Sequence, residues 1–230
     1  MGSIVIKSAH EIELMRQAGR ITAGARSIAR QAIADGVTTK EIDKAVNEFI
    51  KKSGAIPTFL GYGGFPGSAC VSVNDTVIHG IPGKRVIHNG DIVSVDVGAT
   101  YKGFVGDCAG TYACGEISEE AKKLIEVTRQ SFFEGLKFAR VGYRVNDIGT
   151  AIQEYVESHG FSVVREFVGH GVGRDMHEAP EVPNYKVRLS GGNPRLVPGM
   201  TIAVEPMVNI GDWRVKVLDD GWTTVTADGT

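Results

Sequence analysis

Two aspartates stand at equal distances from one predicted turn, and their spacing suggests a cation site. Residues 91–100 and 103–113 are rich in β-forming residues and predict an antiparallel hairpin with its turn at residues 100–103. In that register Asp96 and Asp107 face each other directly, with Cβ atoms about 5 Å apart, where like charges repel. A divalent cation is the commonest remedy for two such carboxylates. The hairpin therefore predicts a metal site.

Two residues further along the chain are candidates to complete the ligand set. His170 lies between Gly169 and Gly171, which permit a close backbone approach, and Glu205 ends an alternating run where an apolar residue is expected. Taken alone, a histidine between two glycines is more often structural than a metal ligand. Here three candidate carboxylates accompany it, and buried carboxylates must be paired or bound to metal, so we interpret His170 as a ligand. Three carboxylates and one imidazole favour Mn, Fe(II), Co or Zn. Two ions about 3.5 to 4 Å apart would share bridging carboxylates.

Two more histidines have settings from which they could reach a site. His79 follows a predicted strand and precedes the turn residues Gly80 and Pro82, and His177 lies seven residues after His170. Either one, taken alone, is explained equally well as a hydrogen-bonded loop histidine.

The glycine-rich segment from Tyr62 to Cys70 also contains aromatic residues and leads into a predicted strand. Its composition alone favours a plain turn. It is not a dinucleotide fingerprint, because no helix start follows it within a βαβ unit.

An internal repeat organises the elements that must carry these residues. At an offset of 106, the amphipathic helix predicted around residues 41–50 matches a second one around residues 147–156, and both end at a glycine, Gly54 and Gly160. Longer helices are predicted before them, at residues 12–34 and 119–139.

A second correspondence involves the carboxylates themselves. At an offset of 109, residues 90–96 match residues 199–205, so Asp96 and Glu205 each stand six residues after a turn glycine on a predicted strand. These matches predict an α+β protein made of two pseudo-symmetric αα-β halves around a central, mostly antiparallel sheet. Asp96 and Glu205 would then approach one central point from opposite sides.

Composition limits the class of protein. The 230 residues carry 25 basic and 27 acidic side chains, with 42% apolar residues, which is typical of a single globular domain over residues 1–230. A pI near 6.3 argues against a nucleic-acid partner. Three cysteines without a C-x-x-C spacing favour a reducing cytoplasm, and we expect no membrane partner because no apolar run approaches the ~20 residues of a spanning helix.

Several motifs carry a family resemblance: Tyr62 to Cys70, Ser72 to Pro82, Gly90 to Gly98, Gly169 to Pro180, and Val204 to Met207. They closely resemble the motifs of type I methionine aminopeptidases of peptidase family M24, and they cover the chain nearly end to end. The resemblance implies the pita-bread fold, a hydrolase that removes the N-terminal methionine, and a site for two divalent metal ions. The lack of a zinc-finger extension favours the short bacterial or organellar kind.

The resemblance also implies roles for individual residues. His79 and His177 match residues that contact the substrate. The resemblance also implies a set of metal ligands and a set of pocket residues. The metal ligands are Asp96, Asp107, His170 and Glu205, and the pocket for the methionine side chain is lined by Tyr62, Phe65, Cys70, Met176 and Trp222. The hypothesis is metal-assisted hydrolysis of the first peptide bond, with Glu205 as the base, His177 bonding the carbonyl oxygen, and His79 helping to protonate the leaving nitrogen.

One departure from the family pattern concerns a fifth ligand. The family has a bridging Glu in a final strand beyond the segment Asp219 to Thr223, and the present sequence reaches Thr230 without it. We therefore expect the second metal to be weak or absent in residues 1–230. The alternative function is a non-catalytic pita-bread binding module, inactive or mononuclear for this reason. Proline-cleaving relatives and creatinase carry an additional N-terminal domain, which this length does not accommodate.

The resemblance implies partners as well. The substrate would be the N-terminus of a nascent polypeptide whose second residue is small. The protein would act in the cytoplasm, with the ribosome as a partner. We expect a monomer.

Overall fold

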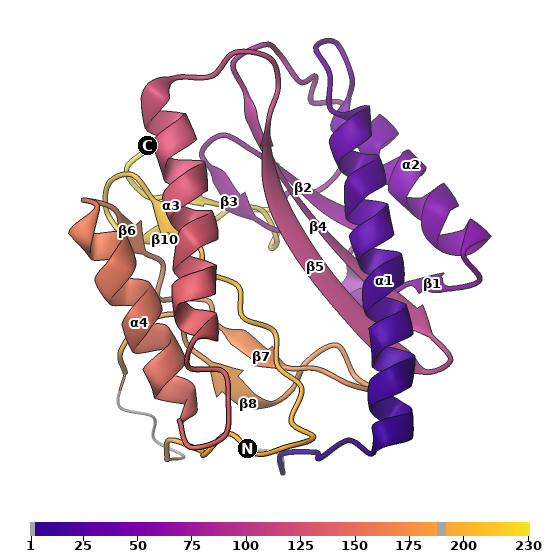
Figure 1. Ribbon diagram of the computed structural model, residues 1–230. Helices are drawn as coiled ribbons and strands as arrows, with labels where there is room; N and C mark the ends of the chain where they lie inside the picture. The colour runs from indigo at the N-terminus through magenta and orange to yellow at the C-terminus, as the bar shows by residue number, and fades with distance from the viewer. Residues whose placement is uncertain (1–2, 188–191) are drawn as a thin grey trace. The chain divides into compact units, whose positions relative to one another are not determined.

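A computed structural model describes residues 3–187 and 192–230, and its chain divides into two compact units. The N-terminal unit contains residues 10–121 and 216–225, and the C-terminal unit contains residues 1–9, 122–215 and 226–230. Each unit is built from a pair of helices followed by strands (Figure 1). This order matches the two αα-β halves predicted from the repeat.

The helices of the N-terminal unit are α1 (Ala9–Ala32) and α2 (Thr39–Lys52). Helix α2 begins with a capping box, in which Thr38 accepts from the N–H of Glu41 while the Glu41 carboxylate accepts from the N–H of Thr38. Its apolar positions Ile42, Val46 and Ile50 recur at helical spacing and are fully buried. Their burial fixes which face of α2 meets the sheet.

The sheet of the N-terminal unit is antiparallel. It contains β1 (Ile56–Pro57), β2 (Ala69–Val73), β4 (Ile92–Tyr101) and β5 (Phe104–Ala113), and β4 pairs with the other three. Figure 1 shows α1 and α2 along one side of the long β4–β5 ribbon. Buried valines of β2 and β4 face the helices in one apolar core, which leaves polar residues on the opposite face of β4.

Shorter elements complete this unit. A 3-10 turn covers Tyr62–Gly64, and a small sheet joins β10 (Val215–Val217), β11 (Thr224–Thr226) and β3 (Thr76–Ile78) in that order.

The register of the β4–β5 hairpin differs from the prediction. Tyr101 pairs with Phe104, so the turn consists of Lys102 and Gly103 alone, and both have positive φ, 48° and 78°. Two-residue hairpin turns with this backbone match the twist of the strands. The predicted centre was one residue too early, and Asp96 therefore pairs with Ala109 rather than with Asp107.

The C-terminal unit contains α3 (Glu119–Leu136) and α4 (Val145–Ser158), followed by two small antiparallel pairs. Strand β6 (Ser162–Val163) pairs with β9 (Val208–Asn209), and β7 (Gly169–Gly171) pairs with β8 (Glu178–Val182). The two helices pack closely, because Gly135 of α3 lies against the side chains of Ile148 and Ile152.

The repeat is visible in the helix bounds. Both bounds of α4 are those of α2 shifted by 106 residues. Gly54 and Gly160, just beyond these two helices, both have positive φ, 72° and 86°. The same backbone requirement at both ends explains why glycine recurs there.

The strand expected at residues 199–205 is only partly formed. Ile202 makes a single bridge to Gly171, and the remaining residues of the segment have no regular strand assignment. The prediction of a full strand there was wrong, although the segment does run beside β7. None of the helices in the described part of the chain is both long and apolar enough to cross a membrane.

Candidate metal and substrate site

Asp96 and Asp107 lie on one face of the β4–β5 ribbon. Asp107 pairs with Gly98, two residues along the strand from Asp96, so the two carboxylates are diagonal neighbours. Diagonal residues on an antiparallel pair are about 7 to 8 Å apart, close enough for long or charged side chains to interact. The same face carries two hydroxyl groups, because the side-chain oxygens of Ser94 and Thr111 form a hydrogen bond of 2.7 Å.

Cys70 belongs to the same face, because it pairs directly with Asp96 across β2 and β4. Burial raises the pKa of its thiol well above the ordinary value, and the charges of Asp96 and Asp107 raise it further. The thiol is therefore protonated at neutral pH. Its place beside the carboxylates follows from strand pairing alone.

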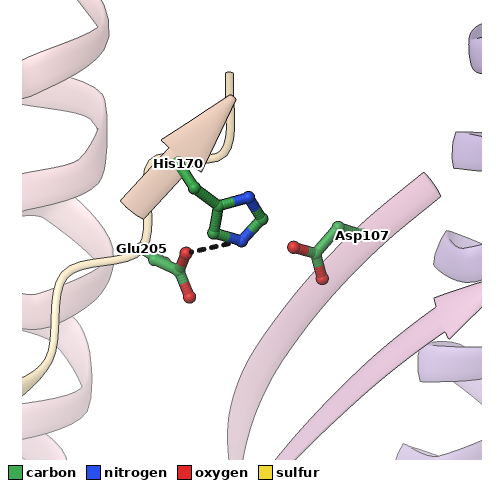
Figure 2. A group of neighbouring side chains, drawn as sticks. All are labelled: Asp107, His170 and Glu205. Atoms are coloured by element: carbon green, nitrogen blue, oxygen red, sulfur yellow. Dashed lines mark ion pairs between the residues drawn. The ribbon is translucent and has the colours of Figure 1, made fainter. Parts of the chain in front are cut away.

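In the C-terminal unit, His170 and Glu205 are in direct contact. His170 Nε2 lies 3.3 Å from Glu205 Oε1, as the dashed line in Figure 2 shows. His170 Nδ1 lies 2.8 Å from the carbonyl oxygen of Gly171. A carbonyl oxygen only accepts, so Nδ1 carries the hydrogen, and a neutral ring then turns the lone pair of Nε2 towards the carboxylate.

The contact between His170 Nε2 and Glu205 Oε1 suits a bound metal ion. Two lone pairs facing each other are stabilised only by a positive charge between them, either a proton or a cation. A histidine fixed by a backbone carbonyl through its other nitrogen is the usual arrangement of a metal ligand. The donor set therefore fits a divalent ion.

Backbone hydrogen bonds hold the segment that bears Glu205. The N–H of Ala203 donates to the His170 carbonyl at 2.7 Å, and the N–H of Val172 donates to the Thr201 carbonyl at 3.2 Å. The fully buried Asn184 donates its amide to the backbone carbonyl of Glu205 at 2.9 Å. Sequence reasoning missed Asn184, and only its polar character among apolar neighbours could have signalled it.

His177 and Met176 lie on the loop between β7 and β8. The ring of His177 packs against the ring of His170, with centroids 4.2 Å apart and an interplanar angle of 63°. Met176 is buried and His177 is exposed. The loop therefore places one imidazole next to another whose Nε2 faces Glu205.

An aromatic cluster of the N-terminal unit gathers the other candidate substrate contacts. Trp222 packs edge-on against Phe65 at 5.1 Å and against His79 at 6.2 Å between ring centroids. Burial lowers the pKa of His79, so its ring is neutral at pH 7. His79 also has a positive φ of 57°, an unusual backbone for a non-glycine residue. Tyr62, in the 3-10 turn nearby in sequence, is exposed.

An imidazole in direct contact with a carboxylate, in a chain of two repeated αα-β units, is typical of a metal-dependent enzyme. A family model for metallopeptidase family M24 matches residues 13–225, and the chain belongs to this family. The protein is thus a metallopeptidase with a divalent metal cofactor. The family's pita-bread fold agrees with the fold predicted from the repeat.

Named relatives are similar over nearly the whole chain. A "Methionine aminopeptidase" of Clostridium acetobutylicum is 55% identical over 228 residues, which is 99% of this chain and 90% of the relative. "Methionine aminopeptidase 1" of Bacillus subtilis is 53% identical over 98% of this chain and 90% of its own length. The crystal structure of methionine aminopeptidase from Thermotoga maritima is 49% identical, with a TM-score of 0.95 over 99% of this chain and 91% of that one.

Proposed function

We propose that this protein is a methionine aminopeptidase, which hydrolyses the first peptide bond of proteins and peptides that begin with methionine. The observation that carries the proposal is the 55% identity over 228 residues to a relative of that name. The donor chemistry of the candidate ligands supports the same conclusion. The substrate is the free N-terminus of a peptide, including that of a nascent chain.

The proposed metal ligands are Asp96 and Asp107 from the β4–β5 ribbon and His170 and Glu205 from the C-terminal unit. Each of these side chains carries an oxygen or nitrogen atom that would serve as a ligand, and Figure 2 draws three of them, Asp107, His170 and Glu205. A set rich in oxygen with one nitrogen suits Mn, Fe(II), Co or Zn. Such an ion, when bound, polarises the substrate carbonyl and brings the pKa of a coordinated water towards neutrality.

Three side chains handle protons and charge in the proposed reaction. Glu205 accepts the proton of the attacking water, because a carboxylate retains lone pairs beyond the one it gives to a metal. His177 donates a hydrogen bond to the carbonyl oxygen as negative charge develops on it. His79, neutral because of its burial, contacts the scissile amide and donates a hydrogen bond to the leaving nitrogen.

The proposed pocket for the methionine side chain is apolar and aromatic. It is lined by Tyr62, Phe65, Cys70, Met176 and Trp222, of which Phe65, Cys70 and Met176 are buried. Polarisable sulfur and aromatic faces suit a thioether. Crowding near the scissile bond favours a small second residue. We further propose that the protein acts as a monomer in the cytoplasm, on nascent chains close to the ribosome.

The decisive experiment measures release of methionine from a Met-Ala-Ser peptide together with metal content per chain. We expect chelation to abolish release, and Mn, Fe(II), Co or Zn to restore it. Added metal should raise the unfolding midpoint, since an ion that binds only the folded state stabilises it. His170→Ala and Asp107→Asn should remove that rise, whereas His88→Ala, at an exposed histidine, should keep it.

Three outcomes separate the possible interpretations. Metal binding with methionine release supports the peptidase. Metal binding with no release from any methionyl peptide would leave a binding module. No metal binding at all would contradict the ligand assignment.

A further inference from the structure

Among the described residues of the C-terminal unit, the most buried lysine or arginine lies outside the proposed reaction. Lys7, in the N-terminal arm that precedes α1, is 5% exposed, although lysine is almost never buried without a partner. Its ammonium group donates to the carboxylate of Glu178 and to the carbonyl of Val5 at 3.3 Å. The two side chains of the Lys7–Glu178 pair are 2% and 9% exposed. The pair is therefore shielded from water.

Glu178 is the first residue of β8 and directly follows His177 in the chain. Its Oε1 accepts hydrogen bonds from the backbone N–H of Arg174 at 2.8 Å and of Asp175 at 3.3 Å. One carboxylate thus ties the middle of the β7–β8 loop to its end. Burial raises the pKa of Glu178, but Lys7 and the two N–H groups outweigh it, so the net pKa is lowered and the carboxylate is ionised.

Gly173 shows how closely this arrangement is packed. A Cβ atom added at Gly173 would meet both the Glu178 Oε1 atom and the side chain of Lys7. Its own N–H donates to the Asp175 carbonyl at 3.1 Å. A side chain at position 173 would therefore displace the ends of the Lys7 and Glu178 side chains.

The arm that carries Lys7 is anchored as well. The backbone N–H of Lys7 donates to the carbonyl of Gly199 at 2.8 Å, at the start of the segment that leads to Glu205. Lys7 therefore contacts both the His177 loop and the beginning of the Glu205 segment, within one unit.

We propose that Glu178, held by Lys7, is a positioning residue that fixes the place of His177 beside His170. The inference rests on the proposed function. It adds Lys7 and Glu178, which are outside the proposed metal ligands and substrate contacts. The physical reason is that catalytic groups displaced by about 1 Å can lose about 100-fold in rate. A loop of residues 172–177 closed by charge-assisted hydrogen bonds keeps its imidazole in one place.

Two double variants isolate the loop-closing oxygen from the charges. Lys7→Met with Glu178→Gln removes both charges but keeps an oxygen that accepts from the loop N–H groups. Lys7→Met with Glu178→Leu removes that oxygen as well. Replacement of both members of a buried ion pair is tolerated far better than removal of one, so we expect both variants to fold, with unfolding midpoints within about 5 °C of each other.

The measurements are kcat and KM for the Met-Ala-Ser peptide and metals per chain. We expect the Gln variant to keep kcat within about threefold and the Leu variant to lose at least about tenfold, with KM and metal content unchanged. Lys137→Met is the matched control, because it removes a lysine from an ion pair whose lysine is 62% exposed in the same unit. It should leave kcat unchanged.

A double-mutant cycle with His177→Ala shows whether Glu178 acts through His177. If it does, adding Lys7→Met with Glu178→Leu to His177→Ala should lower kcat by only about twofold or less. Lys7→Met with Glu178→Ala, which also removes the accepting oxygen, is carried through the same cycle, so the test survives if the Leu variant does not fold.

Equal losses in both backgrounds, or no loss of kcat when the accepting oxygen at position 178 is removed, would overturn the inference. Absence of methionine release by the unaltered protein would instead reject the proposed function.

Discussion

Cys70 on β2 lies directly opposite Asp96 on β4, so a buried thiol and a candidate metal ligand share one face of the sheet. Burial raises the pKa of the thiol, and the nearby charges of Asp96 and Asp107 add to the effect. Because the thiolate is the reactive form, this relationship makes Cys70 a poor nucleophile in the native protein.

The first prediction concerns that reactivity. At pH 8, iodoacetamide should alkylate Cys70 in the folded chain at least about tenfold more slowly than in the chain unfolded in urea, as followed by peptide mass spectrometry. Asp96→Asn should raise the rate only slightly, since burial is the larger cause of the shift. Equal rates in folded and unfolded chains would contradict the assigned burial.

The second prediction tests the two-residue turn that sets the hairpin register. Lys102 has a positive φ of 48°, which asparagine tolerates better than lysine. Lys102→Asn should therefore raise the free energy of unfolding by up to about 1 kcal/mol, and Gly103→Ala should lower it by about 1 to 2 kcal/mol. Urea unfolding measures both. If Gly103→Ala had no effect, the positive φ at that residue would be in doubt.

The third prediction addresses His79. His79→Ala should lower kcat for methionine release by at least about 100-fold, in the range of lost proton transfer, while metals per chain change by less than about twofold. His88→Ala is the control for loss of an exposed imidazole. Equal loss of turnover and of metal would mean that His79 supports the ligands instead.

The fourth prediction uses Asp43, whose half-buried carboxylate accepts from the N–H groups of Ser68 and Ala69 at 2.7 and 2.9 Å. Burial raises its pKa above the ordinary 3.8, and the two hydrogen bonds oppose this only in part. The folded state therefore binds this proton more tightly than the unfolded state does. Its contribution to stability is fully present below pH 3.8 and is lost as pH rises through the folded pKa.

Asp43→Asn should remove this contribution while it keeps an accepting oxygen. Relative to the unaltered protein, the variant should gain free energy of unfolding as pH rises above 3.8, when measured by urea unfolding at pH 4 and pH 7. Glu48→Gln, on the same helix, is an exposed control and should show no such trend. A constant difference between the two pH values would show that the pKa of Asp43 is not raised.

Much of the fold was predictable because its signals are local. A helix that buries one face needs only local signals. Here they are the spacing of Ile42, Val46 and Ile50 and the glycine at position 54. Their recurrence 106 residues later predicted a second helix around residues 147–156, which the structure shows as α4 over Val145–Ser158. The metallopeptidase family was predictable for a related reason, since its motifs are contiguous runs of residues.

Other features depended on pairing, which sequence spacing alone does not fix. The turn between β4 and β5 was placed one residue too early, which shifts the pairing by two residues, because the turn at Lys102 and Gly103 lacks the usual asparagine signal. The segment ending at Glu205 was predicted as a strand, yet its partners β7 and Asn184 give it only scattered hydrogen bonds. The first error arose in local turn chemistry, and the second arose where a distant segment decides the backbone.

The sequence by itself determined the residue types available for chemistry, the helices that carry the cores, and the family. Only the tertiary structure decided that the Nε2 atom of His170 lies beside Glu205, that Cys70 faces Asp96, and that Lys7 reaches Glu178 across 171 positions of chain. The physical reason is that periodicity and turn chemistry act over a few residues. Hydrogen bonds and ion pairs between distant segments exist only once both segments have packed.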